Sequence, residues 1–233
     1  MPQQMLDMLL PVAEALGEEL LGHVAFVGGS TTAFLITDPI TRQAVRFTED
    51  IDLIVHVEGQ AEWQRWQRKL HARGFRQSME DDVICRMRLG SLKVDLMPDD
   101  ENILGFTNRW YRKAIEHAEP YPLNDTVTIN LLAPAYFIAT KLEAYLGRGG
   151  DDPMSSHDLE DIINLVDGRA ELGDEIMGSE ANVRRYIAEQ CGALQRHPNF
   201  DYAIQGNLQE TSRADLFYQR WEQIAALNEY EKQ

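Results

Sequence analysis

The sequence predicts an α+β protein, in which a mixed-sheet domain over residues 1–130 is followed by a helical bundle over residues 131–233. Two observations predict this division. The short apolar segments with strand character all lie before residue 131, where they alternate with helical patterns. Beyond that point the chain carries only the apolar spacing of amphipathic helices. With 44% hydrophobic and 26% charged residues, the composition is that of a globular chain with a sizeable core.

The first domain opens with a helix and a buried strand. Residues 4–22 form an amphipathic helix, because their apolar residues recur on one stripe. The stripe consists of Met5, Leu9, Val12, Leu16 and Leu20. Residues 23–27 are a short apolar run typical of a strand, and residues 31–36 continue from it as the opening of a helix. We expect a loop over residues 37–50 and a second strand over residues 51–57.

The rest of the first domain contains one clear helix and one clear hairpin. The helix over residues 61–75 stops at Gly74, a residue type that commonly ends helices. Residues 83–89 and 92–97 are separated only by Gly90 and Ser91, which predicts a β-hairpin with a tight turn. The remaining expectations are a loop over 98–106, a helix over 107–118 and a strand over 126–130.

The second domain is predicted to be entirely helical. Its helices are expected over residues 134–146, 155–167, 180–196 and 211–228. The glycine-rich segment 147–156 is interpreted as a loop between two of these helices.

Composition excludes several classes of protein. No segment reaches the roughly 18 uncharged apolar residues of a membrane span, so we expect no membrane partner. The N-terminal helix carries acids and no basic leader, unlike a signal peptide. Cys85 and Cys191 match no metal-binding spacing and are interpreted as reduced core thiols of a cytoplasmic protein.

The net charge of −16 opposes nucleic-acid binding at long range. Most of the positive charge, however, lies in three local groups. These are Arg65, Arg68, Lys69, Arg73 and Arg76; then Arg86, Arg88 and Lys93; then Arg109, Arg112 and Lys113. They are consistent either with solvated helix and strand faces or with a phosphate-facing groove on an acidic molecule.

Asp50 and Asp52 flank Ile51 at the start of the second strand. Strand alternation places both carboxylates on one side of the sheet, with their Cα atoms about 6–7 Å apart. Two such carboxylates repel each other unless a cation lies between them, and their hard oxygen ligands suit Mg²⁺. A D-x-D pair alone is a weak motif and, without further features, is more simply interpreted as two exposed acids at the end of a strand.

Two further features strengthen the interpretation of this pair. Gly28, Gly29 and Ser30 follow a buried strand and open a helix, where free backbone N–H groups can bind a phosphate. The spacing matches neither a Walker loop nor a dinucleotide fingerprint. Asp95, between Val94 and Leu96, is a third carboxylate that alternates out of an apolar strand. Three strand aspartates beside a phosphate cradle suit two-metal phosphoryl transfer.

The order G-G-S, D-x-D and a later strand aspartate resembles the DNA polymerase β-type nucleotidyltransferase superfamily. The downstream segments LAPAYFIATKLEA (132–144) and HDLEDI (157–162) are similar to the branch of abortive-infection (AbiE-type) toxins and related mycobacterial toxins. The resemblance covers about residues 20–167. It implies that Lys141 and Asp158 complete the catalytic site, with Asp161 a less certain neighbour. His157 stands where many relatives have lysine and is interpreted as a polar surface residue or a residue that supports the site without binding the metal.

The resemblance also implies a fold and an activity. The fold is a polymerase β-like core followed by a helical domain that contributes Lys141 and Asp158. Gly28, Gly29, Ser30 and Lys141 would bind a nucleoside triphosphate, and Asp50, Asp52 and Asp95 would hold Mg²⁺. A nucleoside monophosphate would then pass to an acceptor hydroxyl.

The acceptor remains open at this point. A toxin acting on tRNA or a protein, neutralised by a cognate antitoxin, is one candidate. A transferase acting on a small cationic antibiotic is another, which the acidic surface suits. The third is a non-catalytic nucleotide-binding module, which the simultaneous presence of Ser30, Asp50, Asp52, Asp95 and Lys141 disfavours.

Overall fold

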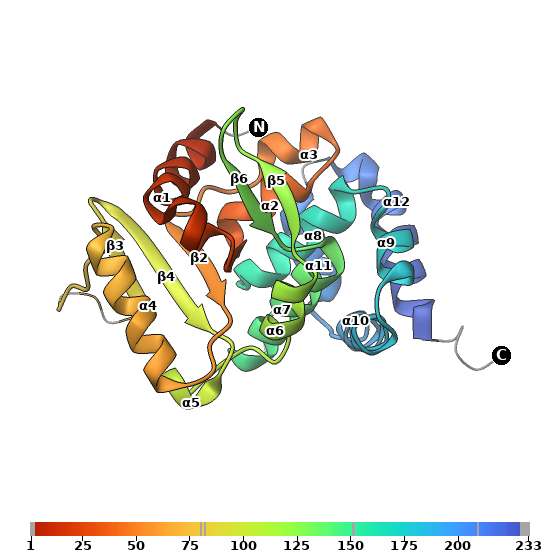
Figure 1. Ribbon diagram of the computed structural model, residues 1–233. Helices are drawn as coiled ribbons and strands as arrows, with labels where there is room; N and C mark the ends of the chain where they lie inside the picture. Colours follow the sequence, from red (N-terminus) through yellow and green to blue (C-terminus); the bar gives the residue numbers. More distant parts are fainter. Residues whose placement is uncertain (1–2, 80, 82, 151, 209, 229–233) are drawn as a thin grey trace. The chain divides into compact units, whose positions relative to one another are not determined.

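The computed structural model describes residues 3–79, 81, 83–150, 152–208 and 210–228. Over these residues it is an α+β structure with a six-stranded mixed sheet (Figure 1). The chain divides into two compact units. The sheet unit contains the chain up to Thr31 together with Arg46–Ala133, and the helical unit contains Thr32–Val45 and the chain from Pro134 onward. This division differs from the predicted continuous 1–130 domain, because residues 32–45 belong with the helices.

The sheet lies entirely in the sheet unit. Its strands are β1 (Val24–Val27), β2 (Asp50–Val55), β3 (Arg86–Leu89), β4 (Leu92–Pro98), β5 (Glu119–Pro122) and β6 (Thr128–Leu131). Their order across the sheet is β3-β4-β2-β1-β6-β5. The central pairs β2–β4 and β1–β6 are parallel, whereas β1–β2, β3–β4 and β5–β6 are antiparallel.

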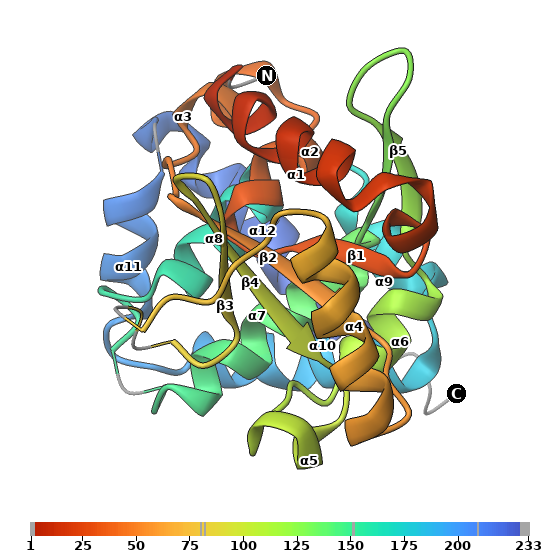
Figure 2. The same cartoon turned by 60° about the vertical axis from the view of Figure 1, so that its left-hand side comes forward.

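Two long helices of the sheet unit, α1 (Gln3–Leu21) and α4 (Gln60–Ala72), lie on the same face of the sheet (Figure 2). The predicted stripe of α1 is buried, as are Trp63, Trp66 and Leu70 of α4. The two helices are joined where Lys69 binds Glu19 at 2.7 Å. Two short helices, α5 (Glu101–Leu104) and α6 (Tyr111–Glu116), and the 3-10 turn η1 (Gly29–Thr31) complete this unit.

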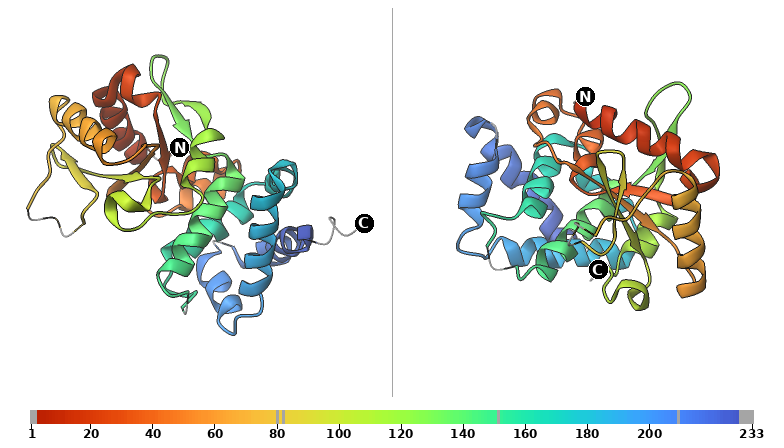
Figure 3. Two further views of the ribbon diagram at one scale, coloured as in Figure 1. Left: turned by 60° about the horizontal axis from the view of Figure 1, so that its bottom comes forward. Right: turned by 90° about the vertical axis from the view of Figure 1, so that its left-hand side faces the viewer.

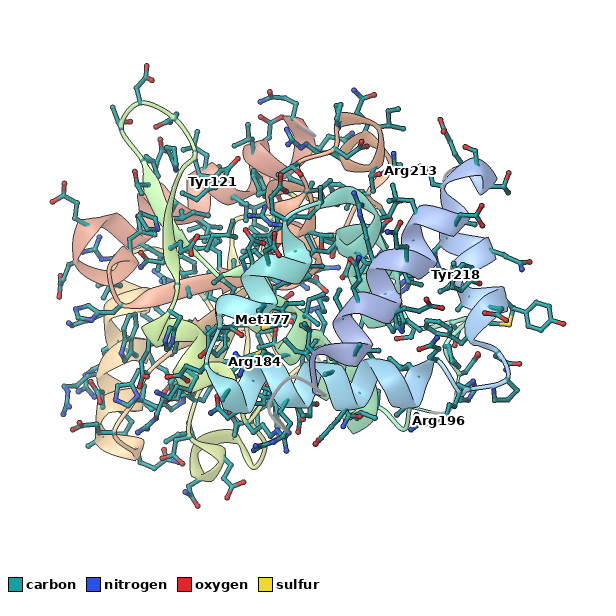
Figure 4. All side chains as sticks on the ribbon, turned by 90° about the vertical axis from the view of Figure 1, so that its right-hand side faces the viewer. Tyr121, Met177, Arg184, Arg196, Arg213 and Tyr218 are labelled. Carbon is teal, nitrogen blue, oxygen red and sulfur yellow. The ribbon has the colours of Figure 1, made fainter. Side chains whose placement is uncertain are left out.

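The helical unit contains α2 (Thr32–Leu35) and α3 (Pro39–Ala44) together with the C-terminal helices shown in Figure 3. The latter are α7 (Pro134–Gly147), α8 (His157–Gly168), α9 (Leu172–Gly178), α10 (Ala181–Leu194), α11 (Phe200–Asn207), α12 (Ala214–Ala225) and the 3-10 turns η2 (Thr211–Arg213) and η3 (Ala226–Asn228). Aromatic rings fill its core, with Trp221 at 4.8 Å from Phe200 and 5.7 Å from Phe217 between ring centroids. Arg184 of α10 donates to the carbonyl of Met177 in α9 at 2.8 Å (Figure 4).

Buried ionic contacts explain why residues 32–45 join the helical unit. The backbone N–H groups of Thr37 and Asp38 donate to the Gly168 carbonyl at 3.0 and 2.8 Å. The Thr41 hydroxyl donates to the buried Asp167 carboxylate at 2.6 Å. Arg213, at the start of α12 (Figure 4), binds Asp167 at 2.8 Å and Asp38 at 3.4 Å. One arginine therefore ties the C-terminal region to the 32–45 segment.

Most elements predicted from the sequence are present, with displaced ends. The helices α1 and α4, the strands β1, β2 and β6, and the β3–β4 hairpin with its left-handed Gly90 (φ 60°) are confirmed. No strand follows residue 131 in the described chain. The predicted loops 37–50 and 98–106 are wrong in part, since they contain α3 and α5. Both helices begin at an aspartate cap, Asp38 and Asp100.

Three further elements were not anticipated, namely β5, α9 and α11. β5 lies at the edge of the sheet and contains Pro120 and Pro122, which remove ladder donors and hide a strand in sequence. Cys85 and Cys191 are free and buried, in agreement with the prediction of core thiols. No helix among the described residues is long and apolar enough to cross a membrane.

Replacing Arg213 by alanine should destabilise the protein by about 3–5 kcal/mol, because Asp167 would remain buried without its cation. The free energy of unfolding from urea denaturation measures the effect. Arg196→Ala is the matched control, because this arginine lies exposed after α10 (Figure 4) and should change stability by at most about 0.5 kcal/mol. Equal losses in the two variants would contradict the anchoring role.

Candidate functional site

Parallel pairing of β2 with β4 brings the three predicted carboxylates together. Asp52 lies directly opposite Asp95 in the register, and Asp50 precedes Asp52 by one pleat. Ile51 and Leu53 are buried, whereas Asp50 and Asp52 are half-buried, as strand alternation predicted. Asp95 is buried, with 8% of its surface exposed. All three carboxylates therefore share one face of the sheet.

The same face is covered further along β4 by α6. Met97 follows Asp95 by two residues and so lies on the same side of the strand. The Tyr111 hydroxyl, in the first turn of α6, donates to Met97 Sδ at 3.1 Å. The carboxylates lie at the beginning of β2 and in the middle of β4, before the point where Tyr111 contacts β4.

The turn after β1 lies against Asp52. Gly28 has a left-handed backbone (φ 76°), and a Cβ built on it would fall onto the Asp52 Oδ2 atom and within 2.7 Å of its Cγ. Only glycine permits this approach of the turn to the carboxylate. The N–H and hydroxyl of Thr31 close the turn by donating to the Gly28 carbonyl at 3.1 and 2.9 Å.

Gly29 and Ser30 are buried in this turn. The Ser30 hydroxyl is fully buried and has no hydrogen-bond partner among the described residues. The helix predicted to follow is only the single turn α2, so its dipole adds little to anion binding here. The 28–30 turn offers backbone and hydroxyl donors rather than a long helix N-terminus.

Arg86 is the residue that sequence reasoning missed at this site. It pairs with Asp95 across the β3–β4 hairpin. Its Nε and one terminal nitrogen bond the two Asp95 oxygens at 2.8 and 2.9 Å, and that terminal nitrogen lies 2.9 Å from Asp50 Oδ2. The bond to Asp95 raises the pKa of Arg86. The two-residue turn at Gly90 and Ser91 already fixes this register, so the pairing was predictable in principle.

The donor set suits Mg²⁺ in chemistry, since three carboxylates and a hydroxyl are hard oxygen ligands. Asp50 Oδ1 is also buried and lacks a hydrogen-bond partner in the described part of the chain. In the observed arrangement, however, no described group of three or more His, Cys, Asp or Glu side chains is placed to hold a metal ion. Arg86 already binds three of the carboxylate oxygens. The metal site therefore stays a prediction.

Lys141, Asp158 and Asp161 form a second charged cluster, in the helical unit. Lys141 Nζ of α7 lies 3.2 Å from Asp158 and 2.7 Å from Asp161, both on α8. All three side chains are buried. The spacing of Asp158 and Asp161 on one helix face is confirmed. A buried Lys141 was expected to need a triphosphate and carboxylates as partners, and the structure shows two carboxylates, Asp158 and Asp161.

Two neighbours lie at the edge of this cluster. The exposed Arg148 side chain binds the second oxygen of Asp158. His157 is exposed and contacts Glu160 at 3.1 Å, which agrees with its interpretation as a polar surface residue.

The basic residues singled out in the sequence are largely paired with acids. Besides Arg86, Arg88 binds Asp81, Lys93 binds Glu49, Arg73 and Lys69 bind Glu19, Arg112 binds Asp99, and Lys113 binds Glu116. Arg65 and Arg68 are exposed on α4. This pairing reduces the positive charge that a phosphate-facing groove would need.

No protein-family model matches the sequence, and no curated protein sequence matches it either.

The contact between Gly28 and Asp52 predicts a strong effect of Gly28→Ala. The left-handed backbone costs an alanine about 1–2 kcal/mol, and displacing the Asp52 carboxylate adds about 1–3 kcal/mol. Gly90→Ala is the control, because Gly90 is also left-handed (φ 60°) and nothing lies within 4 Å of its Cβ position. Urea denaturation measures the loss of unfolding free energy in both variants, and the difference between them is the cost of displacing the Asp52 carboxylate. Equal losses would show that this contact costs nothing.

Lys141→Met should destabilise the protein by about 3–5 kcal/mol, because Asp161 would remain fully buried without the ammonium group. Lys113→Met removes a lysine from the exposed pair with Glu116 and should cost at most about 1 kcal/mol. Thermal and urea denaturation measure both. A Lys141 variant as stable as the Lys113 variant would show that the buried cluster contributes little.

Proposed function

We propose that this chain is a Mg²⁺-dependent nucleotidyltransferase that transfers a nucleoside monophosphate from a nucleoside triphosphate to an acceptor hydroxyl. One observation carries the proposal. Asp50, Asp52 and Asp95 share one face of two parallel strands, and the 28–30 turn approaches the Asp52 carboxylate through a glycine that tolerates no side chain. The proposal rests on the sheet unit alone, because Lys141 has two carboxylate partners within its own unit.

Each group of this site has a role in the proposed transfer. Backbone N–H groups of residues 28–30 and the Ser30 hydroxyl would bind the triphosphate. Mg²⁺ held by Asp50, Asp52 and Asp95 would neutralise the phosphates and polarise their oxygens. Asp95 is assigned as the base that would accept the proton of the acceptor hydroxyl as the hydroxyl oxygen attacks the α-phosphate. The new phosphoester bond forms as the bond to pyrophosphate breaks.

The resemblance to toxins favours tRNA or a protein as the acceptor, with an antitoxin as a further partner. A specific observation favours a second candidate, a small cationic acceptor. The chain carries a net charge of −16, and most of its clustered basic residues are paired with carboxylates. Such a surface attracts a polycation more readily than RNA.

Labelled triphosphates test the proposal directly. Each α-labelled nucleoside triphosphate is incubated with Mg²⁺ and with total tRNA, protein extract or an aminoglycoside in turn. Wild-type protein should label one acceptor class, and Asp52→Asn and Asp95→Asn should reduce the rate by roughly 100-fold or more. Asp125→Asn, an exposed aspartate before β6, is the matched control and should retain activity.

Three outcomes would contradict parts of the proposal. Transfer that persists in Asp52→Asn rejects the assigned site. Absence of label from every acceptor, with triphosphate binding intact by calorimetry, favours a non-catalytic nucleotide-binding module. Label on the aminoglycoside alone rejects the toxin-like function in favour of small-molecule modification.

A further inference from the structure

Arg86 binds two of the three carboxylates of the candidate site at once. It contacts both oxygens of Asp95 and one oxygen of Asp50, all at 2.8–2.9 Å. The Arg86 side chain is 13% exposed and that of Asp95 is 11% exposed. At this depth solvent screens the Arg86–Asp95 pair only weakly, whereas the Asp50 side chain is 36% exposed and its contact is screened more.

The guanidinium offsets the charge of the cluster only in part. Asp50 and Asp95 share the single positive charge of Arg86, so these three side chains keep one formal negative charge. The contact also leaves Asp50 Oδ1 buried, and no group in the described chain donates to it. Burying a carboxylate oxygen without a hydrogen-bond donor costs free energy. A divalent cation, which binds oxygen atoms and carries twice the charge, suits this remainder better than the arginine does.

From this geometry we infer that Arg86 is an internal counter-cation that competes with a divalent cation for Asp50 and Asp95. The inference rests on the proposed function, because it concerns the cation proposed for the same carboxylates. Without that cation, Arg86 holds the β2 and β4 carboxylates together. When the cation binds, Arg86 releases Asp50 and Asp95, so the arginine contact weakens cation binding. Arg86 thereby sets the cation concentration at which the site fills.

The test measures Mn²⁺ affinity by electron paramagnetic resonance in the absence of any triphosphate. Arg86→Gln should bind Mn²⁺ roughly 10- to 100-fold more tightly than wild type, the range by which groups around metal ligands commonly change affinity. Arg88→Gln is the matched control. Arg88 lies on the same strand, and its bidentate partner Asp81 is outside the cluster. The control removes the same charge and should change affinity by about threefold at most, since Arg88 is partly buried against Asp81 and solvent and salt weaken its effect on the cluster.

A second measurement uses the folded wild-type protein and needs no stable Arg86→Gln variant. The Nε–H resonance of Arg86, assigned by its absence from an Arg86→Lys spectrum, should exchange slowly with solvent in EDTA. Saturating Mg²⁺ should shift this resonance and accelerate its exchange, because the bond to Asp95 is lost.

The outcomes separate this inference from the proposed function. Mn²⁺ binding that is equal in Arg86→Gln and Arg88→Gln, or weaker in Arg86→Gln, overturns competition while leaving the cation site intact. Weaker binding would mean that Arg86 orients Asp95 as a ligand. An Nε–H signal that Mg²⁺ leaves unchanged, while Mg²⁺ binds, overturns it as well. Failure of both wild type and Arg86→Gln to bind Mn²⁺ rejects the cation site and the inference together.

Discussion

The parallel register of β2 against β4 is the constraint on which the candidate site depends. It sets Asp52 beside Asp95 and leaves Ile51, Leu53, Val94 and Leu96 in the core. A slip of one residue would bury the carboxylates and expose the apolar side chains, so the hydrophobic pattern fixes the register. This register also places three carboxylates of like charge close together on one face of the sheet, which is unfavourable. The β3 hairpin offsets it by placing Arg86 opposite Asp95.

The same solution recurs within each unit of this acidic chain. Arg86 lies between Asp50 and Asp95, Lys141 between Asp158 and Asp161, and Arg213 between Asp38 and Asp167. With 38 acids and 22 bases, positive side chains are scarce, and these three, Lys141 buried and the two arginines partly buried, each serve two aspartates. Removing one cation leaves two carboxylates without it, at least one of them buried, whereas removing one aspartate leaves the cation a partner. The basic residues are therefore the sensitive members of these clusters.

Local patterns in the sequence predicted the parts of the fold that depend on local chemistry. Alternation around Ile51 identified the strand and the face of Asp50 and Asp52, and Gly90 marked the hairpin. Contacts between residues far apart in the sequence could not be predicted from these local patterns. Nothing near Thr41 shows that its hydroxyl meets Asp167, so residues 32–45 could not be placed with the helices. The caps at Asp38 and Asp100 were visible but followed by helices too short to give a period.

The site also shows where an electrostatic argument from sequence is incomplete. Repulsion between Asp50 and Asp52 requires a cation, but an arginine of the same chain meets that requirement for Asp50 and Asp95. Charge alone thus does not distinguish a metal site from a structural ion pair. Buried polar atoms without a hydrogen-bond partner are a further sign of a ligand site, although structural clusters also contain a few of them. Asp50 Oδ1 and the Ser30 hydroxyl are both buried and lack partners in the described chain, and such a remainder is what a ligand site contains.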